Sequence, residues 1–415
     1  DRPAVFEMFA RRLPGGRRYG VVAGTGRFLD ALAYFRFEDE QIAFLRERGI
    51  VDDRVAKWLA AYRFTGDIWG YPEGECYFPG SPILVVEGTF GEAVLLETLA
   101  LSIFNHDSAI ASAASRMSRA AGDRPLIEMG SRRTHEWSAV AAARAAYLAG
   151  FASTSNLAAG RRYDIPTTGT AAHAFVLLHD DEKDAFVAQI ETLGTNTTLL
   201  VDTYDVRTAI RTAVEIAGTD LGGVRIDSGD LGVVAHEVRA ELDALGATGT
   251  KIVVSGDLDE YAIAGLAAAP VDSYGVGTSV VTGSRAPTAE LVYKLVARGE
   301  PLVGVAKRST GKPTHKGRKW AYRRYEANGV ASAEIVTTDP PDPSGARGGR
   351  DRDDHSARPL LVPLVRRGEI VGGESLTAAR ERHARSRAEL PPTAWQLSRG
   401  EPALSTAYNG VDGGT

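Results

Sequence analysis

The amino-acid sequence predicts an α/β fold whose largest part is a parallel (β/α) barrel. From Leu126 onward, short apolar runs alternate with helical patterns, which is typical of parallel βαβ units. Eight such runs occur, and that number favours a closed barrel. A chain of 415 residues is also too long for one ordinary core, so it predicts either two domains or one barrel with additions.

The predicted barrel strands and the helices between them can be placed by residue number. The strand-like runs are LIEMG (126–130), AGFAST (149–154), IPTTGT (165–170), TTLLVDTYD (197–205), GGVRIDSGD (222–230), KIVVSGD (251–257), VDSYGVGTS (271–279) and PLVGVAK (301–307). The helical patterns are 136–148, 182–193, 207–217, 232–245 and 260–268.

The segments on either side of the barrel mix strands and helices. Those before it are two strand-like runs (5–12 and 81–88), two amphipathic helices (27–35 and 38–49) and one or two buried Ala-rich helices within 92–118. Those after it are a hairpin (AYRRYE with SAEIVTT), a mobile loop (339–356), a strand (358–365) and an Arg-rich helix (377–390).

The composition excludes several classes of protein. Hydrophobic residues make up 44% and charged residues 24%, which are globular values, and a net charge of −5 gives no general reason to bind nucleic acid or an anionic membrane. The single cysteine, Cys76, excludes an internal disulfide, argues against a cysteine-based zinc site and fits a reducing cytoplasm. No run of 18 apolar residues occurs, so we expect no membrane-spanning helix. The chain begins without Met or a targeting pattern, and we expect that some N-terminal residues are missing.

Residues able to carry chemistry follow the predicted strands. In a parallel barrel the active site lies at the C-terminal ends of the strands. The clusters are GSRRTHE (130–136), STSN (153–156), GTAAHAF with His173, RIDSGD (225–230), SGDLDE (255–260) and YGVGTS (274–279). Their glycines, hydroxyls, arginines and carboxylates are the groups needed to hold phosphates, ribose hydroxyls and Mg²⁺. The neighbours of His173 are small, which leaves its imidazole open to a bulky group such as a phosphate.

Each cluster also has a purely structural interpretation. Arg132 and Arg133 either pair with surface acids or bind phosphate and carboxylate oxygens. GVGTS either makes a tight turn or opens its backbone N–H groups onto a phosphate. Asp227 and Asp230 either bond locally or, with Arg225, bind ribose hydroxyls and hydrated Mg²⁺.

For the remaining candidate residues the sequence favours a structural role. For Asp202 and Asp205 in VDTYD the same two interpretations apply, and the structural one is slightly favoured. The histidines other than His173 show no metal-ligand spacing.

Taken in order, the motifs of this chain resemble the nicotinate phosphoribosyltransferases, a type II phosphoribosyltransferase family, and in particular their actinobacterial type. The motifs are GSRRTHE, GFASTSNLAAG, GTAAHAF, LLVDTYD, VRIDSGDL, SGDLDEYAI and DSYGVGTSVVTG. The similarity runs from Ala4 to the C-terminal Arg-rich helix, so it covers almost the whole chain.

This resemblance implies an irregular TIM-like barrel (121–307) and an α+β domain built from segments 1–120 and 308–415. It implies a homodimer with active sites near the subunit interface. The implied reaction joins nicotinate and phosphoribosyl pyrophosphate to give nicotinate mononucleotide and pyrophosphate, with Mg²⁺ and coupled ATP hydrolysis, as the entry step of NAD salvage from nicotinate.

The resemblance also assigns roles by position. His173 matches the histidine that ATP phosphorylates, and Arg132 the arginine near the nicotinate carboxylate or the phosphates. Arg225 and Asp227 match the element around base and ribose, with Asp227 also directed to Mg²⁺, directly or through water. The other implied substrate-binding residues are Ser131, Arg133, Ser155, Thr170, Ser228, Ser255, Gly256, Gly275, Gly277, Thr278, Ser279 and Lys294, of which Gly277, Thr278 and Ser279 form the 5′-phosphate loop. Lys294, Lys312 and Lys316 are weaker candidates for binding pyrophosphate or ATP phosphates.

Two departures from the family pattern and three rival functions remain. The chain begins after the place where a ring-stacking tyrosine segment is expected, and Gly256 stands where a bulkier residue is expected, so we expect a looser loop or a changed ribose contact.

A nicotinamide phosphoribosyltransferase would carry an acidic residue at Ser155, whereas a serine suits a carboxylate substrate. A non-catalytic nucleotide-binding paralogue would lack His173, Arg132 or Asp227, and all three are present. A barrel enzyme that uses only the GVGTS loop would leave the histidine motif unexplained.

Overall fold

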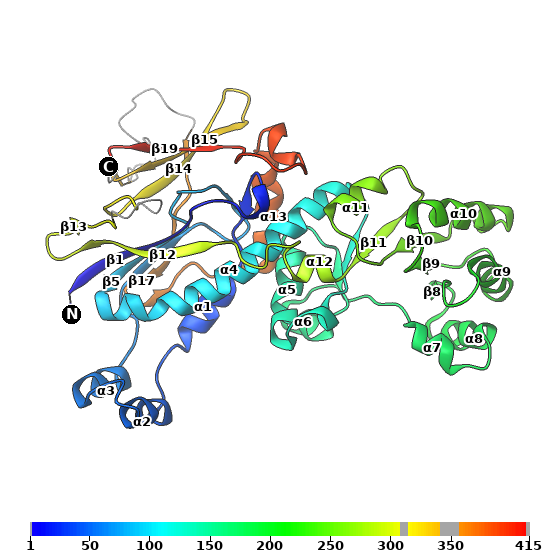
Figure 1. Ribbon diagram of the computed structural model, residues 1–415, viewed down its shortest axis with the longest axis horizontal. Coiled ribbons are helices and arrows are strands. Elements are labelled where there is room, and N and C mark those ends of the chain that lie inside the picture. The colour runs from blue at the N-terminus through cyan, green and yellow to red at the C-terminus, as the bar shows by residue number, and fades with distance from the viewer. Residues whose placement is uncertain (1, 308–313, 341–356, 412–415) are drawn as a thin grey trace. The chain divides into compact units, whose positions relative to one another are not determined.

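The computed structural model describes residues 2–307, 314–340 and 357–411 (Figure 1). Contacts between Cα atoms divide the chain into two compact units: unit 1 is Asp1–Ala109 with Ala286–Thr415, and unit 2 is Ile110–Arg285. The long helix α4 (Phe90–Ala121), predicted as one or two helices, is a single helix that contributes to both units. Most of the loop predicted at 339–356 lies outside the described residues.

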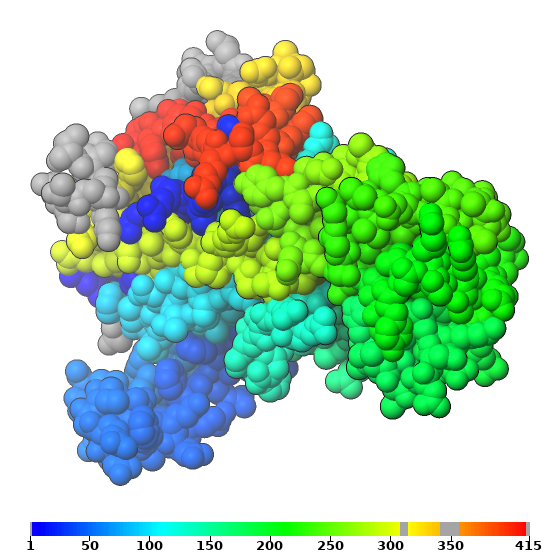
Figure 2. All heavy atoms as spheres, turned by 45° about the vertical axis from the view of Figure 1, so that its right-hand side comes forward, coloured from blue at the N-terminus to red at the C-terminus, as the bar shows by residue number. Residues whose placement is uncertain are grey.

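Unit 2 is a parallel α/β unit with the strand order β7-β6-β11-β10-β9-β8. Its strands are β6 (Leu126–Glu128), β7 (Ser153–Thr154), β8 (Thr198–Leu200), β9 (Gly223–Ile226), β10 (Lys251–Val254) and β11 (Ser273–Val276). Its helices are α5 (Glu136–Leu148), α6 (Leu157–Tyr163), α7 (His173–Leu178), α8 (Glu182–Leu193), α9 (Val206–Ala217), α10 (Leu231–Ala244), α11 (Glu260–Gly265) and α12 (Thr278–Val281). The predicted alternation of strands and helices is confirmed, and Figure 2 shows the outer surface of this unit in green.

The prediction of an eight-stranded closed barrel is wrong in two places. The run 165–170 contributes only an isolated bridge between Thr167 and Thr154, because Pro166 has no N–H to donate to a ladder. The run 301–307 contains β13 (Val303–Gly304), which pairs antiparallel with β12 (Leu291–Arg298) in unit 1. The few residues between these two strands suffice for a hairpin but not for a parallel crossover. Within the described residues the parallel sheet is therefore curled and open, with β7 and β8 as its edges (Figure 1).

Unit 1 contains two larger antiparallel or mixed sheets and one small one. The seven-stranded sheet has the order β13-β12-β1-β5-β3-β17-β18, and its remaining strands are β1 (Pro3–Ala10), β3 (Asp67–Gly70), β5 (Leu84–Thr89), β17 (Val362–Arg366) and β18 (Glu369–Ile370). The four-stranded sheet has the order β16-β14-β15-β19, with β14 (Trp320–Tyr325), β15 (Ala331–Thr337), β16 (Ala357–Pro359) and β19 (Ser405–Asn409). The small sheet pairs β2 (Gly20–Val21) with β4 (Cys76–Tyr77). The helices are α1 (Thr25–Ala33), α2 (Asp39–Glu47), α3 (Asp53–Ala60) and α13 (Leu376–Ala388).

These elements confirm several expectations and correct others. The predicted hairpin is the antiparallel pair β14–β15, and the Arg-rich helix is α13. The single strand predicted at 358–365 is instead two strands, β16 and β17, which belong to different sheets. Helix α3 was not predicted; it begins after Asp52, whose side chain accepts a hydrogen bond from the Val55 N–H as an N-cap.

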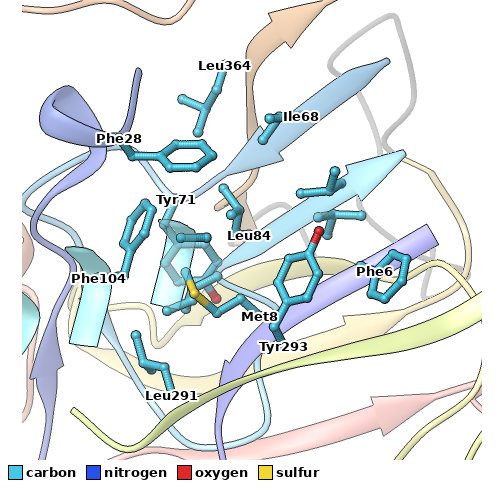
Figure 3. Close-up of a cluster of buried hydrophobic side chains, with 14 of the residues drawn as sticks. Phe6, Met8, Phe28, Ile68, Tyr71, Leu84, Phe104, Leu291, Tyr293 and Leu364 are labelled. Atoms are coloured by element: carbon cyan, nitrogen blue, oxygen red, sulfur yellow. The ribbon is translucent and has the colours of Figure 1, made fainter. Parts of the chain in front are cut away.

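The core of unit 1 forms on the seven-stranded sheet. Apolar side chains from β1, β5 and β12 meet those of α1 and the first part of α4, as Figure 3 shows for Met8, Leu84, Phe28 and Phe104. Phe6 stacks on Tyr293 with a centroid distance of 5.0 Å. The strand predicted at 5–12 is β1, and most of its residues are buried on both faces of the sheet, Glu7 included.

Helix α13 is held against the strands of unit 1 partly by buried polar contacts. Arg323 of β14, fully buried, donates to Glu75 at 2.7 Å and to Glu334 of β15 at 2.7 Å, while Ser386 of α13 donates to the same Glu75. One helical turn before Ser386, the imidazole Nδ1 of His383 lies 3.1 Å from the Gly74 carbonyl oxygen, and its side chain is buried. Burial lowers the pKa of His383 to about 4.

We expect this histidine to make unit 1 less stable as the pH falls. In the unfolded chain His383 binds a proton below pH ~6.5, whereas the folded chain resists protonation down to about pH 4, so stability is lost as the pH falls through that window. The loss by pH 4 should be about 3 kcal/mol. Urea unfolding of wild type and His383→Gln at pH 7.5, 6 and 4.5 measures it. Equal pH dependence in the two proteins would contradict the prediction.

Candidate active site

A cavity of about 600 Å³ lies at the carboxyl edge of the parallel sheet in unit 2. Its lining comes from the turns after the strands, since parallel strands end at the same edge. The lining residues are Met129, Ser131, Arg132, Arg133, Ser155, Gly169, Thr170, Ala171, Ala172, His173, Ala174, Arg225, Asp227, Ser255, Gly256, Asp257, Gly275, Gly277 and Thr278. The cavity thus brings together most of the residues singled out in the sequence.

Arg225 organises one wall of this cavity. It is the third residue of β9, its side chain is 11% exposed, and its guanidinium donates three hydrogen bonds. Nε donates to Ser255 Oγ at 2.8 Å, Nη1 to Thr170 Oγ1 at 2.6 Å and Nη2 to Asp227 Oδ1 at 2.6 Å. Because the guanidinium fork is planar, these bonds fix the ends of three segments relative to one another.

Asp227 is held in its charged form in this wall. Burial disfavours the charged form, but hydrogen bonds from Ser255 and Arg225 outweigh it and lower the pKa of Asp227. Both of those bonds reach Oδ1, and no hydrogen bond to Oδ2 occurs within the described part of the chain. Asp227 therefore presents an ionised carboxylate with one oxygen available to a ligand.

His173 lies at the start of α7 and is paired with Asp202. The imidazole Nε2 is 3.1 Å from Asp202 Oδ1, the histidine side chain is 39% exposed and that of Asp202 is 2% exposed. The other oxygen, Oδ2, accepts bonds from the Asp227 N–H at 2.8 Å and the Ser228 hydroxyl at 2.7 Å. With donors on both oxygens, Asp202 is a buried acceptor that fixes the ring of His173 and leaves Nδ1 for another partner.

Asp202 is the residue that sequence reasoning undervalued. In VDTYD, Asp205 is the N-cap of α9, so the structural interpretation applies to that residue, whereas Asp202 lies behind the cavity lining and contacts the lining residue His173. The same division holds in RIDSGD, where Asp230 is the N-cap of α10 and only Asp227 lines the cavity. Position relative to the following helix separates the two kinds of aspartate. An aspartate immediately before a helix caps it, whereas one at the end of a strand, a few residues before the helix, does not.

Two supporting contacts shape the turn after β6. The buried Glu128 accepts bonds from the Gly130 N–H and the Thr154 hydroxyl, which ties β6 to β7. Asn156 donates to Ser131 Oγ at 2.9 Å. Arg132 and Arg133 follow, both exposed, and within the described ranges neither is paired with a carboxylate. The surface ion-pair interpretation of these arginines therefore finds no support.

The predicted residues outside the cavity lining fall into two groups. Ser228 bonds to Asp202 and Ser279 follows Thr278 in α12, so both lie beside lining residues. Lys294 lies on β12 in unit 1, Lys316 precedes β14 in that unit, and Lys312 lies outside the described residues. Met129 and Asp257 also line the cavity, although the sequence predicted no individual role for either.

The backbone conformation at position 256 requires a glycine. Its φ of +107° lies in the left-handed region, and an added Cβ would stand 2.5 Å from the Asp227 carbonyl oxygen. A bulkier residue would displace the turn that carries Asp227, so the left-handed backbone accounts for the glycine at this position.

We expect Gly256→Ala to damage the site. The forced shift of the Asp227 turn should lower stability by about 1–2 kcal/mol and kcat/KM by about tenfold or more. Gly249→Ala is the matched control, because nothing lies within 4 Å of the Cβ that it would add. Thermal unfolding and steady-state kinetics of both variants measure the effect; equal behaviour would show that the turn tolerates a side chain.

Among the described residues, no group of three or more His, Cys, Asp and Glu side chains is arranged to hold a metal ion. None of the helices in the described ranges combines the length and the apolar character needed to span a bilayer.

Comparison with known proteins identifies the family. Residues 1–105 match the model of the nicotinate phosphoribosyltransferase N-terminal domain, and residues 125–324 match that of the nicotinate phosphoribosyltransferase family. Nicotinate phosphoribosyltransferase pncB1 of Mycobacterium tuberculosis is 58% identical over 415 residues, covering 98% of this chain and 90% of that protein. The Bacillus subtilis nicotinate phosphoribosyltransferase is 39% identical over 336 residues, covering 78% of this chain and 68% of that protein.

Solved structures agree with the sequence matches. Human nicotinic acid phosphoribosyltransferase aligns with a TM-score of 0.82 at 27% identity, over 98% of this chain and 93% of the human chain. A nicotinate-nucleotide pyrophosphorylase from Pyrococcus furiosus aligns with a TM-score of 0.75 at 25% identity, over 94% of this chain and 90% of that one. With matches over nearly its whole length, this chain belongs to the nicotinate phosphoribosyltransferase family.

Proposed function

We propose that this chain joins nicotinate to phosphoribosyl pyrophosphate, giving nicotinate mononucleotide and pyrophosphate in NAD salvage, and that ATP hydrolysis drives the reaction through phosphorylation of His173. The observation that carries the proposal is the cavity in a chain of this family: it places the His173–Asp202 pair beside the Arg225–Asp227 wall. Neither group alone would indicate a phosphoryl acceptor next to a sugar site.

His173 is suited to accept a phosphoryl group. When Nε2–H donates to Asp202, the lone pair of Nδ1 is free to attack the γ-phosphorus of ATP. The new N–P bond forms as the bond from phosphorus to the bridging oxygen breaks, and ADP leaves. Asp202 then balances the positive charge that develops on the ring. The lining neighbours Ala171, Ala172 and Ala174 leave space for the nucleotide phosphates.

The second step requires no general base. The pyridine nitrogen of nicotinate carries no proton at neutral pH, so it attacks the anomeric carbon of the ribose directly as the bond to pyrophosphate breaks. The transition state resembles an oxocarbenium ion, as in glycoside cleavage. The ionised Asp227 is placed to bind a ribose hydroxyl and to stabilise that positive charge.

The remaining lining residues suit the anionic parts of the substrates. Arg132, Arg133 and the Gly277–Ser279 loop offer cationic and N–H or hydroxyl donors to phosphate or carboxylate oxygens. Bound Mg²⁺ would neutralise the leaving pyrophosphate. The free Oδ2 of Asp227 fits that ion, because Mg²⁺ in proteins is usually held by one or two carboxylates together with ligand oxygens and water.

The chemistry of the lining favours nicotinate over nicotinamide. Ser155, which is exposed in the cavity, adds no negative charge, so a substrate carboxylate meets no repulsion there. Among the described lining residues, Met129 has the one large apolar side chain, and its thioether can lie against a pyridine ring.

We further propose a cytoplasmic homodimer. Large apolar side chains are exposed on the helices that follow the lining turns: Trp137 is 78% exposed, Leu157 74% and Leu178 80%. Covering such side chains is a common reason for subunit association. Analytical ultracentrifugation measures the assembly, and a monomer at micromolar concentration would contradict it.

Product formation tests the proposed reaction. Nicotinate, phosphoribosyl pyrophosphate and Mg²⁺ are incubated with the protein, with and without ATP, and nicotinate mononucleotide is measured; a parallel arm replaces nicotinate by nicotinamide. We expect product from nicotinate, a higher rate with ATP and little product from nicotinamide. No product in any arm would reject the assignment and favour a nucleotide-binding paralogue.

A further inference from the structure

The turns that follow β6 and β7 are joined by hydrogen bonds to one buried carboxylate, that of Glu128. Glu128 is the last residue of β6 and is 1% exposed. Its Oε1 accepts a hydrogen bond from the Gly130 N–H at 2.5 Å, and its Oε2 accepts one from the Thr154 hydroxyl at 2.5 Å. Since one carboxylate binds a donor from each side, it holds the two turns at a fixed separation.

The connection continues through Asn156 and forms a closed ring. The Asn156 N–H donates to Thr154 Oγ1 at 3.0 Å, and the side-chain Nδ2 donates to Ser131 Oγ at 2.9 Å. The orientation of that amide is fixed, because its Oδ1 accepts the Ala159 N–H at 2.8 Å as the N-cap of α6. The NH₂ group therefore faces Ser131, and the ring returns to the turn after β6.

This ring lies directly before the two arginines of the cavity. Arg132 and Arg133 complete the short 3₁₀ turn that begins at Ser131, and both line the cavity. Within the described residues neither guanidinium has a carboxylate partner. The place of their charged ends is therefore set by the backbone of the turn, which the ring holds.

The turn after β6 has little room to move. A Cβ added at Gly130 would stand 2.2 Å from Val281 Cγ1 and 2.9 Å from the Gly277 carbonyl oxygen. The turn is thus packed between Glu128 and the loop proposed to bind the 5′-phosphate. Because close-packed groups transmit a displacement, a shift of Gly130 would reach that loop as well as the arginines.

We propose that Glu128 is a positioning residue, which holds Arg132 and Arg133 where they bind carboxylate or phosphate oxygens of the substrates. This inference rests on the proposed function, since those oxygens belong to nicotinate and phosphoribosyl pyrophosphate. The purely structural alternative is that Glu128 only stabilises the edge of the sheet. The two roles differ in what a change of Glu128 does to substrate binding.

Glutamine at position 128 cannot satisfy both donors. The Gly130 N–H can only donate, so the amide oxygen must face it, and the amide NH₂ then faces Thr154. The Thr154 hydroxyl would have to accept from that NH₂, and its own hydrogen would lose its acceptor in a fully buried site. Because this donor is left unpaired, we expect the ring to open and the arginine turn to shift.

The expected result is a change in KM rather than in kcat. Contacts to the anionic groups of a substrate act alike in the ground state and the transition state, so their loss weakens binding without slowing the chemical step. In Glu128→Gln we expect the KM of nicotinate or of phosphoribosyl pyrophosphate to rise about tenfold, as for the loss of one charge-assisted hydrogen bond, while kcat falls less than about threefold. The KM that rises identifies the anion that the arginines bind.

Steady-state kinetics of the full-length protein without ATP, with each substrate varied in turn, test the inference. Thr154→Val removes the hydroxyl but keeps the carboxylate, so it opens the ring at a second point and should raise the same KM, even if Glu128→Gln does not fold. Thr154→Ser keeps the hydroxyl and should keep the wild-type KM. Glu241→Gln is the matched control, because Glu241 is a buried glutamate of the same unit that binds Arg207 and Arg211 and does not line the cavity.

A protein that lacks both arginines shows whether Glu128 acts through them. With Arg132→Ala and Arg133→Ala already present, adding Glu128→Gln should raise that KM no further. The inference is overturned if KM rises as much in that background, or if Glu128→Gln lowers kcat and leaves both KM values unchanged, as a loss of folded enzyme would. Absence of product in the wild type would instead reject the proposed function.

Discussion

Replacing His173 by alanine should abolish the stimulation of nicotinate mononucleotide synthesis by ATP. The substitution removes the one imidazole among the described residues that line the cavity. Without the acceptor, ATP hydrolysis coupled to product should fall at least about 100-fold, since losses of this order or larger follow removal of a nucleophile. Product formation measured without ATP should change far less, because the attack of nicotinate on the ribose does not pass through the imidazole.

A matched control uses a second histidine of the same unit. His236 lies on the exposed face of α10, with its Nδ1 2.8 Å from the Gly232 carbonyl oxygen, and it does not line the cavity. His236→Ala should keep full stimulation by ATP. The phosphohistidine mechanism would be contradicted if His173→Ala were stimulated as strongly as the control.

The periodicity of the sequence was sufficient to place most secondary structure of unit 2. The predicted helices 136–148 and 182–193 have the same bounds as α5 and α8, and the predicted helix 207–217 begins one residue after the start of α9. Strand pairing was harder, because an apolar run such as 301–307 looks alike in parallel and antiparallel sheets. What decided its partner was the short turn after β12, a constraint of geometry rather than of hydrophobicity.

The candidate site was predictable where residue type and position agree. His173 follows one strand-like run, Arg225 and Asp227 lie within another, and all three carry distinctive chemistry and line one cavity. Asp202 follows a strand in the same way, but its role depends on a contact with His173, 29 positions away in the chain. A single sequence holds no information on which turn approaches which, so an aspartate in a turn is by default a local hydrogen-bond acceptor.

Replacing Asp202 by asparagine should slow phosphorylation of His173 by about 100- to 1,000-fold, because the carboxylate both fixes the ring and balances its charge. The amide keeps the size of the side chain but has one acceptor oxygen where the carboxylate has two. That oxygen would have to serve either His173 Nε2–H or the two donors from Asp227 and Ser228. If it serves those two, the amide NH₂ faces Nε2, and the proton moves to Nδ1, where it blocks the attack.

The two roles of Asp202 can be separated by measuring both activities. ATP-independent synthesis depends on the position of Asp227, whose backbone N–H donates to Asp202. The rate of that synthesis should therefore fall by about tenfold, much less than the phosphorylation rate. Asp230→Asn is the matched control: Asp230 caps α10, asparagine caps equally well, and neither rate should change appreciably. Equal losses of the two activities in Asp202→Asn would mean that the aspartate only supports the turn. A selective loss of phosphorylation would instead show that the charge of Asp202 acts on the histidine itself.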